Sequence, residues 1–351
     1  MLEKLKIIDL STVLAGPSVA TFFAELGSHV IKIENKNNPD VTRSWFFQGE
    51  EKQDVSAYFS SINYKKEYRS LDLLNPIDYT SFLEEISTTD ILISNFKQGD
   101  EEKLNVSDKV LRVINPSLII GKIQGFSDES DRVAYDLILQ AETGFMSING
   151  TQESGPLKMP VALIDVLAAH HLKEGLLLAL MDRTKNGTAK TVEVSLYDAA
   201  VCSLMNQASN YLMSGKIPER MGSLHPNIAP YGELFETKDG QLITFAIGSN
   251  LHFSKLCRFL ELDLVINDIR FIDNQQRVIH RNELEKLLEE KVSLRTSEQI
   301  ITALRAEKVP YGIIKNIDEV LSSDASKKMI KSEIINTKST KRMSQIAFKW
   351  K

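Results

Sequence analysis

Hydrophobic and polar positions alternate between two periods along the first third of the chain. Short β-branched runs at residues 5–11 and 29–34 predict strands, and apolar residues spaced three and four apart between them predict a helix from Pro17 to Gly27. The succession continues with strand patterns at 68–73, 89–96 and 117–126 and helix patterns at 78–87 and 107–114. Strands that alternate with helices predict an open, Rossmann-like parallel sheet with helices on both faces.

The pattern changes after residue 126. A mostly apolar stretch at 166–183 predicts a helix buried between layers, followed by a strand at 191–196 and one helix over 197–215. Residues 216–232 are rich in Pro and Gly, residues 233–248 predict a hairpin, and 309–315 predict one more strand. We therefore expect a large domain over 1–215, a smaller α/β domain over 216–325, and a segment, 326–351, that can return to the large domain.

Composition and charge exclude several classes of protein. The 351 residues carry a net charge of −5 with both signs interspersed, whereas a nucleic-acid partner normally requires a basic excess. No apolar run reaches the length of a membrane span, and the N-terminus lacks the pattern of a signal peptide. The two cysteines, Cys202 and Cys257, are expected to be core thiols in a reducing cytoplasm. The basic residues of the tail, Lys338, Lys341 and Arg342, are expected to be solvated.

Candidate binding groups cluster at the predicted strand ends. Gly16 and Pro17 open a helix directly after the first strand, where backbone N–H groups favour a phosphate. Glu34 ends the second strand, where an NAD-binding fold places an acidic residue, but the motif G-x-G-x-x-G is absent and disfavours a dehydrogenase. Further polar and basic residues lie near strand ends and suit a phosphorylated ligand, although each lysine alone is more often a surface charge: Lys65, Lys66, Asn95, Lys97 and Lys103.

One carboxylate stands out because of its surroundings. Asp165 interrupts the apolar run KMPVALIDVLAA at the start of the long predicted helix. An unpaired carboxylate is costly to bury, so it is expected either to cap the helix or to react at the floor of a pocket. The pattern alone favours the cap. The adjacent His170 and His171 face different ways on a helix, no metal-binding spacing is present, and no G-x-S-x-G motif indicates a hydrolase.

Read in order, these segments resemble the class III CoA-transferase family, which also contains formyl-CoA transferases, carnitine CoA-transferases and α-methylacyl-CoA racemases. The resemblance extends to about residue 325. The segments that carry it are DLSTVLAGPSVATFFAELGSHVIKIE, DVTRSW, YFSSINYKK, LDL, TDILISNFKQG, INPSLIIGKIQGF, YDLILQAETGFMS, VALIDVLAA, LMDRTKNGTAKTVEVSLYDAA, RMGSLHPNIAPYGELFETKDGQLI and RFIDNQQRVIHRNEL.

The resemblance implies a catalytic role for Asp165. In such enzymes this carboxylate attacks an acyl-CoA thioester, forms a mixed anhydride and then an aspartyl-CoA thioester, and finally passes CoA to an acceptor acid. A carboxylate is a weak nucleophile, and its anhydride must be kept from water, so an apolar position at a helix start suits the chemistry. The resemblance implies acyl-CoA and a carboxylic acid as substrates and no tightly bound cofactor or metal.

The same resemblance implies where CoA binds. The matching positions are Val13, Leu14, Ala15, Lys66, Asn95, Phe96, Lys103 and Leu104, with Lys36 as a substitute for a basic residue that some relatives carry at Asn35. Tyr135 and Gln140 are expected to line the acyl pocket. The racemases of the family have His-Asp where this chain has Tyr135-Asp136, and tyrosine is a poor proton carrier at neutral pH, so transfer is favoured over racemisation.

The resemblance also implies a homodimer whose two chains interlock. From the charge, the hydropathy and the two cysteines we expect a cytoplasmic protein without a nucleic-acid or membrane partner. Two alternatives stay open at this point. The first is an acyl-CoA racemase or epimerase, and the second is a non-catalytic CoA-binding protein.

Overall fold

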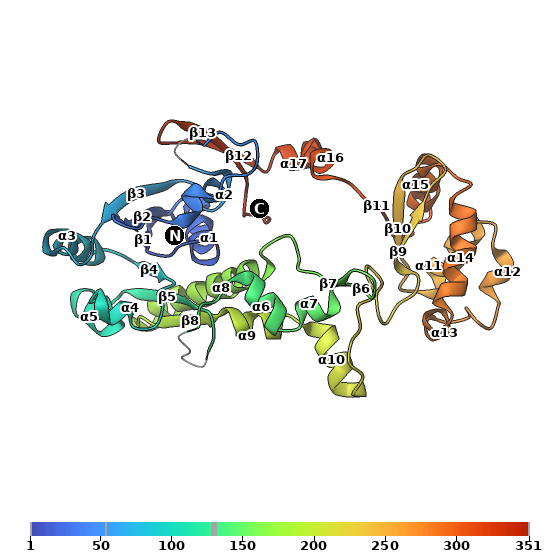
Figure 1. Ribbon diagram of the computed structural model, residues 1–351, viewed down its shortest axis with the longest axis horizontal. Coiled ribbons are helices and arrows are strands. Elements are labelled where there is room, and N and C mark those ends of the chain that lie inside the picture. Colours follow the sequence, from blue (N-terminus) through green and yellow to red (C-terminus); the bar gives the residue numbers. More distant parts are fainter. Residues whose placement is uncertain (1, 53–54, 128–131, 350–351) are drawn as a thin grey trace. The chain divides into compact units, whose positions relative to one another are not determined.

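The computed structural model describes residues 2–52, 55–127 and 132–349 (Figure 1). Contacts within the chain divide it into two compact units. The first consists of the described parts of residues 1–146, 158–218 and 325–351, and the second of residues 147–157 and 219–324. The short segment 147–157 thus packs with the second unit, although the sequence pattern groups it with the large domain. No helix of the described residues is long and apolar enough to cross a membrane.

A six-stranded sheet forms the centre of the first unit. All of its neighbouring strands are parallel, which confirms the predicted open sheet. The strand order places β1 beside β4, so the order reverses between these two strands. In spatial order the strands are β3 Lys66–Leu71, β2 His29–Asn35, β1 Lys6–Asp9, β4 Ile91–Ser94, β5 Ile119–Gln124 and β8 Thr191–Ser195.

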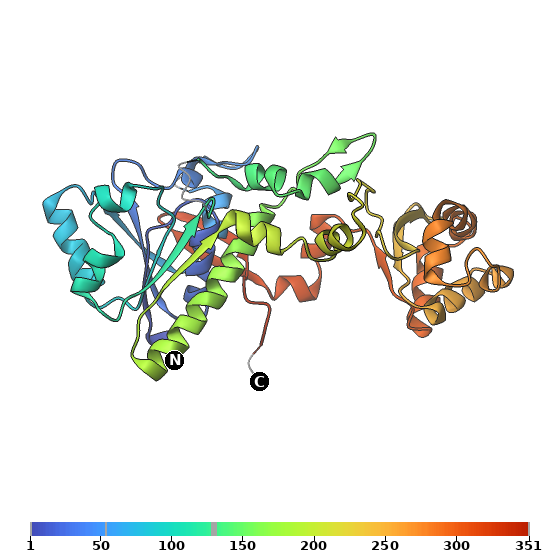
Figure 2. The ribbon, with the colours of Figure 1, turned by 90° about the horizontal axis from the view of Figure 1, so that it is seen from below.

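Helices cover both faces of this sheet, as the alternating pattern predicts (Figures 1 and 2). On one face α1 Ala15–Glu25, α8 Leu163–Asn186 and α9 Leu196–Cys202 bury apolar side chains against β1, β4 and β5. On the other face α3 Pro76–Ile86 and α5 Asp108–Ile114 pack around Phe82 and Leu111. These two apolar layers hold the strand ends in fixed positions.

Helix α8 lies unusually close to the sheet. A Cβ atom added to Gly175 would lie 2.4 Å from Cγ1 of Val192 in β8, so only glycine permits this approach. The helix begins at Leu163 with Ala162 as its N-cap, and that cap provides no side-chain hydrogen bond. The prediction that Asp165 directly precedes the helix and caps it is therefore wrong, because Asp165 lies inside the first turn.

Several short elements of the first unit escape prediction because they span only one or two turns. The predicted single helix over 197–215 is two helices, α9 and α10 Met205–Ser214, separated at Ser203 and Leu204. Cys202 ends α9 and is exposed, so its assignment as a core thiol is wrong, whereas Cys257 is buried. The remaining short elements are η1 Leu2–Lys4, η2 Val41–Ser44, α2 Ala57–Ser61, α4 Asp100–Lys103 and α6 Asp136–Glu142.

The C-terminal segment forms an antiparallel hairpin, β12 Ile330–Ile335 and β13 Lys338–Met343, that packs with α2. The expectation of a solvated basic tail is wrong for two of its three residues. Arg342 is buried and forms a 2.6 Å ion pair with Glu25, and Lys338 Nζ donates to Glu50 Oε1 at 3.0 Å. Their charges therefore attach the hairpin to the first unit, while Lys341 between them stays exposed.

The second unit is built on a three-stranded antiparallel sheet with the order β11-β10-β9. The predicted hairpin and the predicted late strand both belong to it, since β10 pairs with β9 and with β11. Its strands are β9 Tyr231–Glu236, β10 Leu242–Ala246 and β11 Tyr311–Ile313, and a small hairpin is formed by β6 Gly150–Thr151 and β7 Gly155–Pro156. Its helices are α11 Asn250–Phe259, α12 Asp263–Ile266, α13 Asn274–Ile279, α14 Arg281–Val292, α15 Ser297–Ala306 and α16 Ile317–Leu321. Two short helices, α7 Phe145–Ile148 and α17 Asp324–Lys327, lie where the chain passes between the units.

Candidate active site

Two cavities open where the strand order reverses, at the carboxyl ends of β1 and β4. Their volumes are about 510 and 490 Å³. Thr12, Asn95, Phe96 and Lys97 line both, so the loops after β1 and β4 form the wall between them. A crevice at such a reversal is the usual ligand site of an open α/β sheet.

The predicted CoA-binding residues divide between these cavities. Val13, Asn95 and Phe96 line the first, and Asn95, Phe96, Lys103 and Leu104 line the second. Leu14 is half-buried and precedes α1, while Ala15 is buried in its first turn. Neither Leu14 nor Ala15 is among the residues that line the two cavities. Both stay predictions.

Asn95 holds the loop after β1 by its side chain. Its Oδ1 accepts a hydrogen bond from Thr12 N at 2.9 Å, and its Nδ2 donates to Thr12 O at 2.9 Å. The amide of Asn95 is therefore engaged with protein backbone. Each polar atom of the amide keeps capacity for a second hydrogen bond, so its expected contact with CoA stays a prediction.

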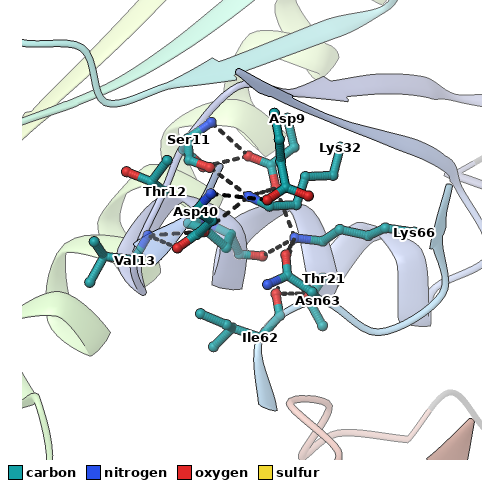
Figure 3. A network of polar contacts seen from close by, with 12 residues as sticks. Asp9, Ser11, Thr12, Val13, Thr21, Lys32, Asp40, Ile62, Asn63 and Lys66 are labelled. Carbon is teal, nitrogen blue, oxygen red and sulfur yellow. Dashed lines mark hydrogen bonds and ion pairs between the residues drawn. The ribbon is translucent and has the colours of Figure 1, made fainter. Parts of the chain in front are cut away.

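Lys66 is bonded inside the protein. Its side chain is fully buried, and its Nζ donates to Asp9 Oδ2 at 2.8 Å, to Asn63 Oδ1 at 2.8 Å and to two backbone carbonyls (Figure 3). Burial lowers the pKa of Lys66 to about 8, although Asp9 opposes this change. The hydrogen-bonding capacity of Lys66 is used inside the protein, and its expected contact with the phosphates of CoA stays a prediction.

Asp165 combines burial with the absence of a compensating donor. Its side chain lies in the first turn of α8 and is only 8% exposed. Within the described ranges, no backbone or side-chain donor bonds to its carboxylate. Burial, and secondarily the like charge of Asp136, raises the pKa of Asp165 to about 7. A carboxyl group in this state is poised between its neutral and charged forms at physiological pH.

The true cap of α8 comes from a neighbouring helix. Asp136 Oδ1 accepts a hydrogen bond from Ile164 N at 2.7 Å, and its Oδ2 accepts one from Gln140 Nε2 at 2.6 Å. Gln140 Oε1 in turn accepts from Met159 N at 2.7 Å, and the side chain of Gln140 is fully buried. Gln140 therefore holds the segment before α8 in place, and its expected position in the acyl pocket stays a prediction.

Two tyrosines flank this carboxylate pair. Tyr135, beside Asp136, is half exposed and lines the first cavity, and its assignment to the acyl pocket stays a prediction. Burial and the charges of Asp165 and Asp136 raise the pKa of Tyr58 to about 12, so its hydroxyl stays protonated. Tyr58 is the residue that the sequence pattern misses. It lies on the short helix α2, which has too few residues to produce a periodic signal.

Comparison with known proteins places this geometry in a family. The model of CoA-transferase family III matches residues 2–351. The succinate–glutarate CoA-transferase of Agrobacterium fabrum is 34% identical over 328 residues, which cover 92% of this chain and 82% of that protein. The human succinyl-CoA:glutarate CoA-transferase is 30% identical over 92% of this chain and 73% of its own length. The acetyl-CoA:oxalate CoA-transferase of Acetobacter aceti is also 30% identical, over 93% of this chain and 85% of its own length.

A solved structure agrees with these sequence relatives. The crystal structure of a CaiB/BaiF family protein from Brucella suis superposes with a TM-score of 0.83 and 31% identity, over 99% of this chain and 92% of that one. The resemblance noted from the sequence segments is thereby confirmed. The chain belongs to CoA-transferase family III, and it is an enzyme of the class that moves CoA between an acyl-CoA and a carboxylic acid.

Proposed function

We propose that Asp165 is the nucleophile of this CoA transfer. The observation that carries the proposal is a desolvated carboxylate, without a hydrogen-bond donor among the described residues, in the first turn of a buried helix. A structural carboxylate at such a position would normally bond to the backbone N–H groups of the helix start. Here Asp136 takes that role, which leaves Asp165 for chemistry.

The transfer proceeds through two anhydrides. Asp165 attacks the thioester carbonyl of the donor, CoA thiolate leaves, and a mixed anhydride forms. The thiolate then attacks the aspartyl carbonyl, which releases the donor acid and leaves an aspartyl-CoA thioester. The acceptor carboxylate attacks this thioester, CoA thiolate leaves, and a second anhydride forms. The thiolate then attacks the acceptor carbonyl of that anhydride, which gives the acceptor's CoA thioester and releases the carboxylate of Asp165. Each bond broken is matched by one formed, so no external energy source is required.

The surroundings of Asp165 support these steps. Its burial keeps water from the anhydrides, which water would otherwise hydrolyse. The start of α8 contributes a positive dipole end that favours the developing oxyanion. The hydroxyl of Tyr58, which interacts electrostatically with Asp165, stays protonated and so adds no negative charge to this site.

We propose that CoA itself lies along the wall between the two cavities, in contact with the loops after β1 and β4. Val13, Asn95, Phe96, Lys103 and Leu104 support this placement because they line the cavities at the reversal of the sheet. Lys97 lines both cavities and Lys103 lines the second, so both can offer a positive charge to the phosphates of CoA.

For the substrates we propose succinyl-CoA as a donor and a dicarboxylic acid such as glutarate as the acceptor. Support comes from relatives, since the proteins of Agrobacterium fabrum, mouse and human carry these acids in their names. The interlocked dimer and the cytoplasmic location remain predictions from the family resemblance.

Trapping tests the role of Asp165. The enzyme is incubated with succinyl-CoA and hydroxylamine, digested, and analysed by mass spectrometry for a hydroxamate at Asp165. Asp165→Asn should lower turnover by at least about a thousandfold. Asp182→Asn, at the far end of the same helix, should leave both trapping and turnover intact. Full turnover with an unmodified Asp165 would refute the proposal.

A further inference from the structure

The loop between β1 and α1 adopts a backbone conformation that its sequence disfavours. Val13 has a φ of +71°, in the left-handed region that β-branched residues avoid. A strained residue of this kind persists only where the surrounding structure holds it in place. Val13 lines the first cavity, and the adjacent Thr12 lines both. The strain therefore lies in the wall to which CoA is assigned.

Asp40 is the group that holds the strained residue. Its two carboxylate oxygens lie 3.4 and 3.3 Å from Val13 N, which donates to them. Lys32 Nζ lies 3.3 Å from Asp40 Oδ2 and donates to Ser11 O at 2.7 Å (Figure 3). Both side chains are fully buried. Lys32 thus holds the carbonyl of Ser11 at the start of the loop. It also holds the carboxylate of Asp40, which accepts from Val13 in the middle of the loop.

The pair belongs to a larger buried set of charges. Asp9 and Asp40 balance Lys32 and Lys66, and all four side chains are inaccessible to solvent. The positive charges of Lys66 and Lys32 keep the pKa of Asp9 below its usual value, although burial opposes this. Buried ion pairs are often no more stabilising than apolar residues of similar size, so stability alone is a weak reason for such a set. This set of charges also bonds to the backbone of Ser11 and Val13, so it can fix the conformation of the loop after β1.

We propose that Asp40, held by Lys32, is a positioning residue that keeps Val13 in its left-handed conformation and thereby shapes the wall against which CoA binds. The inference rests on the proposed placement of CoA at this loop. It predicts an effect on CoA affinity and on the KM for acyl-CoA. It predicts little effect on kcat, because acyl transfer takes place at Asp165.

A double-mutant cycle between positions 40 and 13 tests this coupling. Glycine adopts a positive φ without cost, so Val13→Gly should make the support by Asp40 nearly redundant. With Val13 in place, Asp40→Asn should raise the Kd for CoA about tenfold, measured by calorimetry on the full chain. With glycine at position 13, the same change should raise the Kd less than about threefold. An equal effect in both backgrounds would overturn the inference.

Two controls separate this inference from the placement of CoA and from general destabilisation. Asp90→Asn removes a carboxylate that holds Lys6 N and Arg183 at the opposite end of the sheet, so it should cost stability without changing the Kd for CoA. Lys97→Ala probes the cavity wall directly. If Lys97→Ala weakens CoA binding and Asp40→Asn does not, the positioning role is wrong while the placement stands. If neither variant weakens binding, the placement fails and the inference fails with it.

A charge-neutral variant keeps the test valid if Asp40→Asn does not fold. Lys32→Gln combined with Asp40→Asn removes one charge of each sign and leaves no buried charge without a partner. The cycle with Val13→Gly is then run on this pair, with the same expected contrast. A drop in kcat with an unchanged KM, in either version of the cycle, would also overturn the inference.

Discussion

At the scale of single residues, the carboxyl group of Asp165 must satisfy two opposing requirements. It has to be ionised to attack a thioester, yet burial and Asp136 raise its pKa to about 7. Below that pH most of the free enzyme would hold a neutral, unreactive carboxyl group. We therefore expect kcat/KM for acyl-CoA to rise with pH, and the acid limb of this pH profile should have an apparent pKa of about 7. A limb near the ordinary value for an aspartate, about 4, would contradict the assigned environment.

A neighbouring substitution checks the cause of this limb. Asp136→Asn removes the like charge but keeps an oxygen that can accept from Ile164 N. The limb should then move to lower pH without reaching the ordinary value, because burial is the larger cause of the raised pKa. Asp182→Asn, distant on the same helix, should not move it.

The same raised pKa predicts a gain in stability on mutation. The folded state binds the Asp165 proton more tightly than the unfolded state, so ionisation between about pH 4 and 7 costs stability, and the loss is complete above pH 7. Asp165→Asn removes this loss. At about pH 8 the variant should be more stable by up to about 4 kcal/mol, and near pH 4 the two proteins should agree. Urea unfolding at both pH values measures the difference, and a variant less stable at pH 8 would contradict the account.

At the scale of elements, the approach of α8 to the sheet depends on one missing side chain. Gly175→Ala should destabilise the protein by about 1–3 kcal/mol, although alanine is the better helix former, because the new methyl group meets Val192. Combining it with Val192→Ala should recover part of that loss by making room. Thermal unfolding of both variants is the measurement. If Gly175→Ala alone is as stable as the parent protein, the helix can shift without loss of stability and the prediction is wrong.

Prediction from the sequence succeeded where an element is long and periodic. The parallel sheet and α8 follow from alternating runs of apolar residues. Asn95 and Phe96 directly follow a predicted strand, and this position places them at the cavities. It did not reveal the internal partners of Gln140 and Lys66, whose polar groups turn inward in the expected segments. Whether a polar side chain faces a cavity or a buried partner depends on contacts distant in sequence, such as Lys66 with Asp9.

Charged residues near the chain end show the same limit. The pattern around Lys338 and Arg342 is that of a solvated tail, and it contains no apolar period that would reveal β13. Glu25, the ion-pair partner of Arg342, lies more than 300 residues away along the chain. Short local windows cannot reveal such pairs.

At the scale of the whole molecule, the family resemblance predicts a dimer of interlocked chains. The chain mass is 39.5 kDa, so light scattering on the purified protein should give twice this value. Interlocked chains cannot separate without unfolding, so dilution should leave the mass unchanged. A mass that falls to that of one chain on dilution would contradict the interlocked arrangement.

The central claim is that an oxygen atom of Asp165 is exchanged with the substrates during each transfer. In the proposed order of steps, the acceptor carboxylate attacks the aspartyl carbonyl, so one of its oxygens bridges the second anhydride. CoA thiolate then takes the acceptor acyl group, and the bridging oxygen stays on Asp165. The most direct measurement is mass spectrometry of the Asp165 peptide after turnover with an acceptor acid labelled with ¹⁸O. The account predicts that the label enters this carboxylate and no other. Turnover that leaves Asp165 unlabelled would contradict it.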